Sequence, residues 1–223
     1  MNLPPEFSLT IQNHDDGWLP IEVVPYAESH APWFSGVWKR MADGLAKSHA
    51  LVNSPPPGWI QWKPWSWVHE TKPGYERRNT LVALANSQVV GFINVWPDSP
   101  SGIDPSRNTL YIEHVAACPW NLTSQLWQRK YRHIGPALLA YAQWHSQSCG
   151  NDGNLSLHAA DAAALDFYRK LESGRPQPLF THKQTGILGP TPHGHHVDRK
   201  LTYLEIIANG GLELLEDYRN DKF

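Results

Sequence analysis

The chain has 223 residues, of which 41% are hydrophobic and 18% charged, and its formal net charge is −2. These proportions allow a substantial core and argue against a disordered chain. The sequence shows no basic stripe, no signal-peptide pattern and no apolar run of the roughly 20 residues that span a bilayer, so we expect a cytoplasmic protein without a nucleic-acid or membrane partner. Its two cysteines are too few for a disulfide framework.

The first part of the chain predicts an extension followed by the start of one domain. Residues 1–20 are polar with scattered prolines and are expected to form an N-terminal arm. A single domain is expected over residues 21–223, beginning with a short strand at residues 21–24. Apolar residues at helical spacing predict an amphipathic helix over residues 32–48. Residues 53–76, rich in proline and tryptophan, are expected to form a loop.

Four of the eleven tryptophans lie in a nine-residue stretch inside this loop: Trp59, Trp62, Trp65 and Trp67. Aromatic side chains bury large areas, so we interpret the segment as a rigid loop anchored over the domain. The same loop is a candidate wall of a substrate pocket, with Trp65 and Trp67 as the substrate-binding residues. A carbohydrate-binding surface is the alternative that these aromatic residues leave open.

The rest of the chain alternates strand-like and helix-like segments. The expected strands are 80–85 and 88–96, joined as a hairpin by Asn86 and Ser87, then 109–118, 155–158, 179–188 and 200–207. The expected helices are 133–148, 161–171, which begins at the capping residue Asp161, and 211–218. Residues 97–107 are expected to form a loop. This order predicts an α/β (α+β) fold with a central mixed β-sheet flanked by helices.

The turn at residues 131–139 is the most informative local feature. It follows the predicted strand 109–118, contains Gly135, and opens the predicted helix 133–148. The first N–H groups of a helix have no partner within the helix, and the helix dipole adds partial positive charge there. The segment therefore predicts a site for an anion such as a phosphate.

The order of the elements and their motifs resemble the GNAT superfamily of acetyl-CoA-dependent N-acetyltransferases. Three segments carry the resemblance: the hairpin Thr80–Trp96, the strand and turn Leu110–Leu139, and the strand and helix Leu155–Leu171 with its Phe-Tyr pair. The resemblance implies a GNAT-like fold and acetyl-CoA as cosubstrate. It also implies that a cleft between two parallel strands, 110–118 and 155–158, receives the pantetheine arm.

The resemblance further implies a set of cofactor-binding residues. Aligned on its Ile-Gly-x-x-Leu-Leu run, the turn has His133 where the family usually has glycine, and Gly135 at the second glycine position. A second register matches Arg132, Gly135 and Ala137 to the usual spacing. The implied contacts to the pantetheine amides and the pyrophosphate are Val115, Ala116, Ala117, Arg129, Lys130, Arg132, His133, Ile134, Gly135, Pro136 and Ala137.

The reaction that the resemblance implies is attack of a neutral amine on a thioester. An amine such as that of lysine has a pKa near ~10.4, so a base must remove a proton first. Glu113 is the first candidate base, because a carboxylate among apolar strand residues is costly unless it is paired or functional. His158 is the second. Tyr168 matches the family tyrosine that can hydrogen-bond the thioester sulfur and act as general acid for the leaving thiolate. Each of the three also has an interpretation as a structural residue.

Trp120 and Asn121 follow the predicted strand 109–118 where the active site should lie, and are candidate substrate-binding residues. The expected acceptor is an amine of a small molecule or a peptide, and a homodimer is left open. We interpret His193, His195 and His196 as part of a flexible surface loop and expect no metal site. A non-catalytic acyl-CoA-binding module that acts as a sensor or partner domain is the main alternative to an enzyme.

Overall fold

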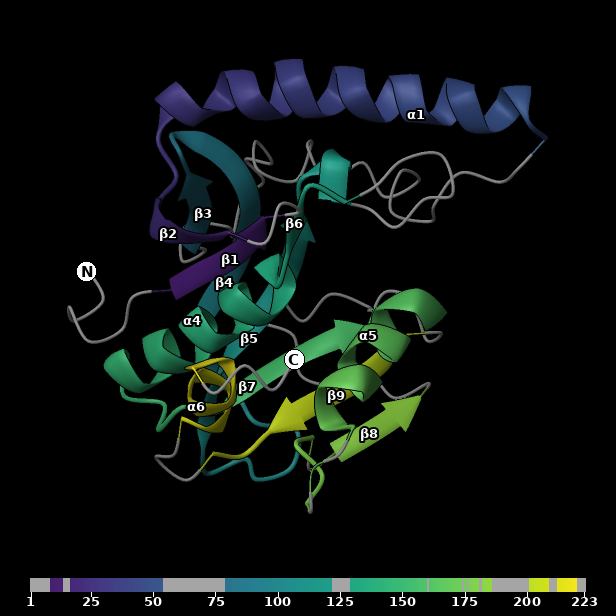
Figure 1. The fold of residues 1–223 in the computed structure, drawn as a ribbon. Helices are drawn as coiled ribbons and strands as arrows, with labels where there is room; N and C mark the ends of the chain where they lie inside the picture. Colours follow the sequence, from purple (N-terminus) through teal and green to yellow (C-terminus); the bar gives the residue numbers. More distant parts are fainter. Residues whose placement is uncertain are drawn as a thin grey trace. The chain divides into compact units, whose positions relative to one another are not determined.

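In a computed structural model of the chain, the described residues are 9–13, 17–53, 79–121, 129–159, 161–173, 175, 177–180, 182–185, 201–208 and 212–219. The chain divides into two compact units. The first unit comprises residues 1–72, 80–93 and 114–138, and the second comprises residues 73–79, 94–113 and 139–223. Each unit contains a layer of hydrogen-bonded strands (Figure 1).

The strands of the first unit follow the order β6-β1-β2-β3-β4-β5. Their outer members are β6 (Tyr131–Arg132), β1 (Leu9–Asn13), β2 (Trp18–Pro25) and β3 (Asn79–Ala85), which pair in antiparallel fashion. In β1 the side chains of Leu9 and Ile11 are buried, whereas those of Thr10 and Gln12 are half-buried. Strand β1 therefore has one face on the core and one toward solvent.

Two of these strands were not predicted from the sequence. Strand β1 lies in the segment expected to form an arm, although its Leu-Thr-Ile-Gln run has the period of two that is typical of a half-buried strand. Strand β6 is two residues long and carries no sequence signal of its own. It exists because Tyr131 pairs with Asn13 and Arg132 pairs with Gln12.

A helical segment packs on the sheet of the first unit. It comprises a π-helical stretch, η3 (Pro32–Trp38), continued by α1 (Lys39–Leu51), and confirms the helix predicted over residues 32–48. Phe34 and Trp38 are fully buried, with ring centroids 5.6 and 5.9 Å from that of Phe92 in β4. The indole N–H of Trp38 donates to the carbonyl of Val89 at 3.2 Å. These contacts attach the helix to β4.

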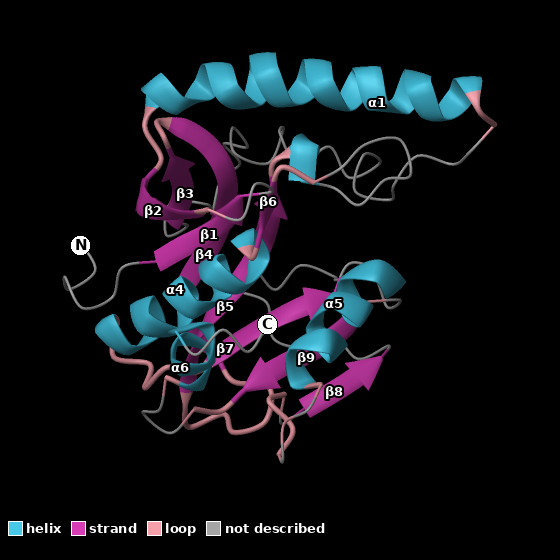
Figure 2. Ribbon diagram, in the orientation of Figure 1, coloured by secondary structure: helices cyan, strands magenta, loops and turns pink. Residues whose placement is uncertain are grey.

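The strands of the second unit follow the order β4-β5-β7-β9-β8. Strand β5 pairs with β7 in parallel, whereas β7–β9 and β9–β8 are antiparallel, so the sheet is mixed as predicted (Figure 2). The strands are β4 (Gln88–Pro100), β5 (Asn108–Ala117), β7 (Leu155–Ala159), β8 (His182–Thr185) and β9 (Thr202–Ile206). The helices are α4 (Ile134–Ser148), α5 (Ala162–Glu172) and α6 (Glu213–Arg219), and two single turns precede α1 and α4: η2 (Glu28–His30) and η4 (Pro119–Asn121).

Strand β4 is longer than predicted. It continues to Pro100, through a segment expected to belong to a loop, and Asp98 adopts a positive φ of 59° within it. The two prolines and Asp98 predict a turn, but the carbonyl of Ser99 accepts a hydrogen bond from the Thr109 hydroxyl, and Ser101 N–H donates to the carbonyl of Arg107. Hydrogen bonds to β5 and to the connection between β4 and β5 thus override the preference of these residues for a turn.

Helix α5 begins at the predicted cap. The carboxylate of Asp161 accepts a hydrogen bond from Ala164 N–H at 2.8 Å. We expect Asp161→Ala to lower the free energy of unfolding by about 1 kcal/mol, because one of the first N–H groups of the helix loses its acceptor. Urea denaturation measures the loss. Asp161→Asn retains a capping oxygen and should recover most of it, whereas equal losses in the two variants would contradict a capping role.

Candidate functional site

In the first unit, the turn before α4 is held in place through its backbone. The side-chain carbonyl of Asn121 accepts a hydrogen bond from Tyr131 N–H at 2.9 Å, and the backbone carbonyl of Trp120 accepts one from Lys130 N–H at 3.3 Å. Pairing of β6 with β1 fixes the next residue, Arg132. The chain therefore enters α4 from a rigid support. The predicted substrate contacts of Trp120 and Asn121 remain predictions.

His133 adopts a backbone conformation that favours glycine, the residue that the resemblance implies at this position. Its φ is 68°, in the left-handed region that favours glycine, and its carbonyl accepts a hydrogen bond from Ala137 N–H at 2.9 Å. The N–H groups of Ile134 and Gly135 precede this first bond of the helix, and Pro136 has none. The start of α4 thus keeps the geometry in which helix N–H groups point at an anion.

Gly91 of β4 packs against the first turn of α4, where a side chain would not fit. A Cβ atom at this position would lie 2.8 Å from Cγ2 of Ile134, 3.0 Å from Cδ1 of Leu138 and 3.2 Å from the carbonyl oxygen of Ala116. The first turn of the helix can therefore approach the strand closely only because residue 91 has no side chain. The sequence reasoning missed this residue. A glycine inside the strand-like run 88–96 was the available signal.

The other predicted cofactor residues differ in exposure. Arg129, Lys130 and Arg132 are exposed, His133 and Gly135 are half-buried, and Ile134, Pro136 and Ala137 are buried. On β5, Ala116 is buried, whereas Val115 and Ala117 are half-buried. This distribution leaves three cations in solvent beside a helix start whose apolar residues enter the core. Contact of these residues with a cofactor stays a prediction.

The parallel ladder between β5 and β7 is short. It pairs Leu110 with Leu155, Tyr111 with Ser156, and Ile112 with Leu157, although β5 continues to Ala117 and β7 to Ala159. Beyond Leu157, β7 keeps its antiparallel partners on β9. The residues of β5 that were predicted to bind the pantetheine arm therefore follow the end of this ladder.

In the second unit, Glu113 is oriented by a tryptophan. Its side chain is half-buried, and Oε2 accepts a hydrogen bond from the indole N–H of the buried Trp96 at 2.9 Å. This hydrogen bond orients the carboxylate on β5. The indole N–H of Trp96 is thus one partner of the Glu113 side chain.

His158 lies among aromatic residues at the end of β7. Its Nδ1 is 3.0 Å from the hydroxyl of Tyr111, and its ring centroid is 5.1 Å from that of Tyr203. Burial lowers the pKa of His158 to about 4, so the imidazole is neutral at neutral pH. Within the described part of the chain, the buried Nε2 atom has no hydrogen-bond partner. Either tautomer leaves Nε2 available for one further hydrogen bond.

Tyr168 is buried on α5. Its ring lies 5.1 Å from that of Phe167 and 5.6 Å from that of Phe180, which it meets nearly edge-on at 82°. Burial raises the pKa of Tyr168, and the hydroxyl therefore stays protonated. Such a group is a good hydrogen-bond donor but a weak acid. The aromatic packing alone is also what a purely structural tyrosine would show.

Several predicted positions lie outside the described residues: Trp65 and Trp67 of the Pro/Trp loop, and the loop that contains His193, His195 and His196. Among the residues that the structure does describe, no three His, Cys, Asp or Glu side chains gather into a group able to hold a metal ion. No helix in the described ranges is both long and apolar enough to cross a membrane.

Comparison of the sequence with protein-family models and with curated proteins gives no match. Several solved structures resemble the chain. A GNAT-family acetyltransferase from Staphylococcus aureus is 13% identical over 84% of this chain and 99% of its own, with a TM-score of 0.48. The PaiA N-acetyltransferase of Thermoplasma acidophilum, solved with coenzyme A, is 13% identical over 83% and 98%, with a TM-score of 0.45. An uncharacterized protein from Bacillus halodurans is 10% identical over 97% and 98%, with a TM-score of 0.52.

At these identities the likeness concerns the fold. The central mixed β-sheet flanked by helices that the sequence predicts is confirmed. The activity, the acceptor and the roles of individual residues require separate arguments.

The buried imidazole of His158 should make stability depend on pH. Its pKa is about 4 in the folded chain and near ~6.5 when unfolded, so the unfolded state binds the proton first as the pH falls. The stabilisation is complete above about pH 6.5 and is lost progressively down to about pH 4, by on the order of 1–2 kcal/mol after allowance for partial solvent exposure. Urea denaturation at several pH values should show a flatter profile for His158→Gln. Parallel profiles for the unsubstituted chain and for His158→Gln would contradict a contribution of His158 to the pH dependence.

Proposed function

We propose that this chain is an acyl-CoA-dependent N-acyltransferase that transfers an acetyl or longer acyl group to an amine of a small molecule or a peptide. The start of α4 carries the proposal. His133 keeps the left-handed backbone of a glycine, Ile134 and Gly135 offer N–H groups that precede the helix ladder, and Gly91 leaves the space in which this turn forms. A pyrophosphate is a ligand that matches such a helix start.

The proposed chemistry is direct attack of the amine nitrogen on the thioester carbonyl. The N–C bond forms, the C–S bond breaks, the amine loses a proton and the CoA thiolate leaves. We assign proton removal to Glu113, whose carboxylate is oriented by Trp96 and attracts an ammonium group. His158 supplies a neutral polar group in the same unit. Because burial disfavours its charged form, it does not repel a cationic substrate.

Tyr168 is proposed to donate a hydrogen bond to the departing sulfur. A thiolate such as that of cysteine has a pKa of about 8.5, whereas burial raises the pKa of Tyr168 above its usual value of about 10. Complete proton transfer from Tyr168 to sulfur would therefore run uphill. Hydrogen-bond donation stabilises the developing charge without that transfer. Of the two roles expected from the sequence, we therefore propose hydrogen-bond donation.

The test is release of free CoA thiol from acetyl-CoA and longer acyl-CoA donors with a panel of amines. The proposal expects turnover with at least one pair. It also expects Glu113→Gln to lower kcat/KM by on the order of 10²-fold or more, as for loss of a general base. A folded protein that binds acyl-CoA but shows no turnover would instead support the non-catalytic module. In that case the aromatic packing of Tyr168 against Phe180 would have a purely structural role. A protein that binds no CoA would contradict both.

A further inference from the structure

Three strands of the first unit bring Trp18, Gln12 and Arg132 into one row. Gln12 of β1 is the direct partner of Trp18 on β2 and of Arg132 on β6. Directly paired residues point to the same face of a sheet. This face is the solvent side, because Trp18 and Arg132 are exposed, whereas their neighbours Leu9 and Ile11 on β1 are buried. Two strand spacings, about 10 Å, separate the backbones of Trp18 and Arg132.

The side chain of His133 extends this row at the start of α4. Its ring is stacked on Trp18, with centroids 5.9 Å apart and planes inclined by 22°. His133 has a positive φ, and its side chain packs against Trp18. A residue larger than glycine is therefore accommodated at this position. Even with the stack, Trp18 remains 47% exposed, which is unusual for so large an apolar side chain and leaves indole surface available to a ligand.

Three cationic residues lie among the four residues that precede His133. Arg129, Lys130 and Arg132 are all exposed in the segment that leads to His133. The Lys130 ammonium lies 5.0 Å from the ring centroid of Tyr131 and 3.5 Å from the side-chain carbonyl of Gln88, both of which are neutral groups. An exposed aromatic surface beside clustered cations is the combination that binds a nucleotide, because the base stacks and the phosphates pair with the cations.

We propose that Trp18, His133 and Arg132 bind the adenosine end of the CoA cosubstrate, with the adenine ring stacked on Trp18 and the ribose 3′-phosphate paired with Arg132. The inference rests on the proposed function, because it takes the pyrophosphate of the same molecule to lie at the start of α4. It assigns His133 a role as a wall of the adenine site. A residue at the usual glycine position then adds affinity for the nucleotide and does not obstruct the phosphates.

Isothermal titration calorimetry with three ligands separates the parts of the molecule. CoA carries adenine, ribose and the 3′-phosphate, and dephospho-CoA lacks the 3′-phosphate. 4′-Phosphopantetheine lacks the whole adenosine portion and one of the two phosphates of the pyrophosphate. We expect Trp18→Leu to weaken CoA binding on the order of 10-fold and to leave 4′-phosphopantetheine unchanged. Trp18→Phe keeps an aromatic surface and should recover most of the affinity. Arg132→Gln should weaken CoA several-fold and dephospho-CoA much less.

His133→Gly is the sharpest single variant, because glycine accepts the same backbone conformation without strain. The proposal expects a loss of CoA affinity of a few-fold, whereas tighter CoA binding would show that the ring obstructs the site and would overturn it. Unchanged CoA affinity in Trp18→Leu would also overturn it and would leave the proposed function standing. If Trp18→Leu weakened the binding of CoA and of 4′-phosphopantetheine equally, the proposal would also be overturned. The substitution would then act on the phosphate-binding turn and not on an adenine site. Failure of the wild-type protein to bind CoA at all would remove the proposed function itself.

Discussion

Replacing Glu205 with alanine should lower the free energy of unfolding by at least about 3 kcal/mol, one of the two largest effects that we expect from a single substitution. Glu205 lies on β9 and is fully buried. Its carboxylate accepts hydrogen bonds from the hydroxyl of Ser101, from Gly102 N–H at 2.9 Å and from the Tyr203 hydroxyl at 2.5 Å. Alanine would leave the hydroxyls of the buried Ser101 and Tyr203 without this acceptor, and each unsatisfied buried donor costs about 1–3 kcal/mol. Gly102 N–H would keep its second acceptor, the Tyr203 hydroxyl.

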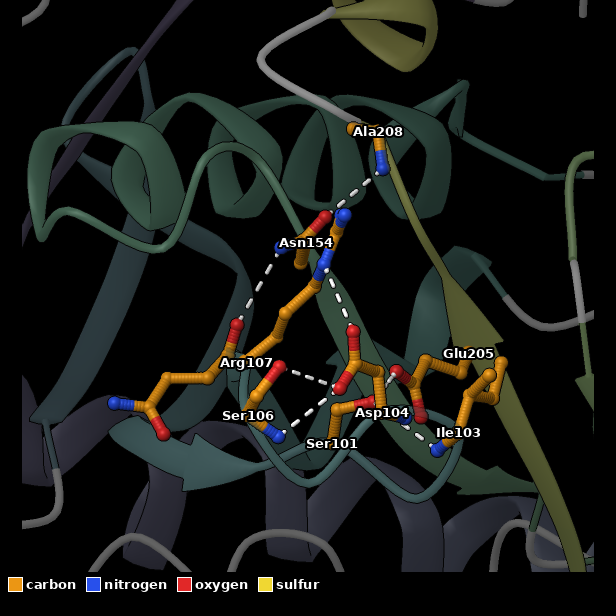
Figure 3. Close-up of polar contacts among 9 residues, drawn as sticks. Ser101, Ile103, Asp104, Ser106, Arg107, Asn154, Glu205 and Ala208 are labelled. Atoms are coloured by element: carbon orange, nitrogen blue, oxygen red, sulfur yellow. Dashed lines mark hydrogen bonds and ion pairs between the residues drawn. The ribbon is translucent and has the colours of Figure 1, made fainter.

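The effect should reach the whole connection between β4 and β5. The Ser101 hydroxyl donates to Glu205 and accepts hydrogen bonds from Ile103 N–H at 3.1 Å and Asp104 N–H at 2.9 Å, so the carboxylate orders this turn through one side chain (Figure 3). Burial and the bond to Glu205 also raise the pKa of Tyr203, which keeps its hydroxyl protonated as a donor. A loss of loop order should accompany the loss of stability.

Urea denaturation of Glu205→Ala measures the change in free energy, and hydrogen exchange of the Gly102 to Asp104 amides measures loop order. Glu205→Gln keeps the volume and one acceptor oxygen and should lose less. Arg169→Ala is a control for removal of a charge: Arg169 forms an exposed ion pair with Asp166 at 3.2 Å, which should contribute little. A loss in Glu205→Ala no larger than that of the control would show that the network does not stabilise the fold.

Local patterns predicted most of the elements. The helix at η3 and α1, the hairpin strands β3 and β4, β5, β7 and α5 lie where periodicity, turn residues and the cap at Asp161 placed them. These signals are local, because the alternation of buried and exposed side chains and the capping of a helix end are both carried by neighbours in the sequence. The motif that suggested a GNAT-like fold was carried by the same segments.

Long-range partners explain what was not predicted. Strand β6 depends on a register with β1 across more than a hundred residues of sequence, and the carboxylate of Glu205 is satisfied by a turn equally remote in the chain. No spacing rule joins Trp96 to Glu113 or Trp18 to His133. The sequence could therefore name residues of a candidate site, but not the partners that orient them, since those partners depend on the folded arrangement of distant segments.

Gly91→Ala should be the second large effect, because the added methyl group has no room. Its Cβ would lie 2.8 Å from Ile134 Cγ2, 3.0 Å from Leu138 Cδ1 and 3.2 Å from the Ala116 carbonyl oxygen. Overpacking of this kind costs about 1–3 kcal/mol, which outweighs the ~0.5–1 kcal/mol that replacing a strand glycine by alanine gains in backbone entropy. The carbonyl oxygen belongs to the backbone of β5, so the strain should fall on the start of α4. We expect weaker CoA binding together with lower stability.

Gly44→Ala is a matched control with the opposite expected sign. Gly44 lies in the interior of α1 and is exposed, and the methyl group of an alanine there would meet no neighbouring atom within 4 Å, so alanine should stabilise the chain by about 0.5–1 kcal/mol. A double-mutant cycle identifies the cause in Gly91→Ala. Ile134→Ala removes Cγ2, the nearest clashing atom, so the loss of the double variant should be smaller than the sum of the single losses. Additive losses, or an unchanged affinity for CoA in Gly91→Ala, would show that this glycine does not set the position of the helix start.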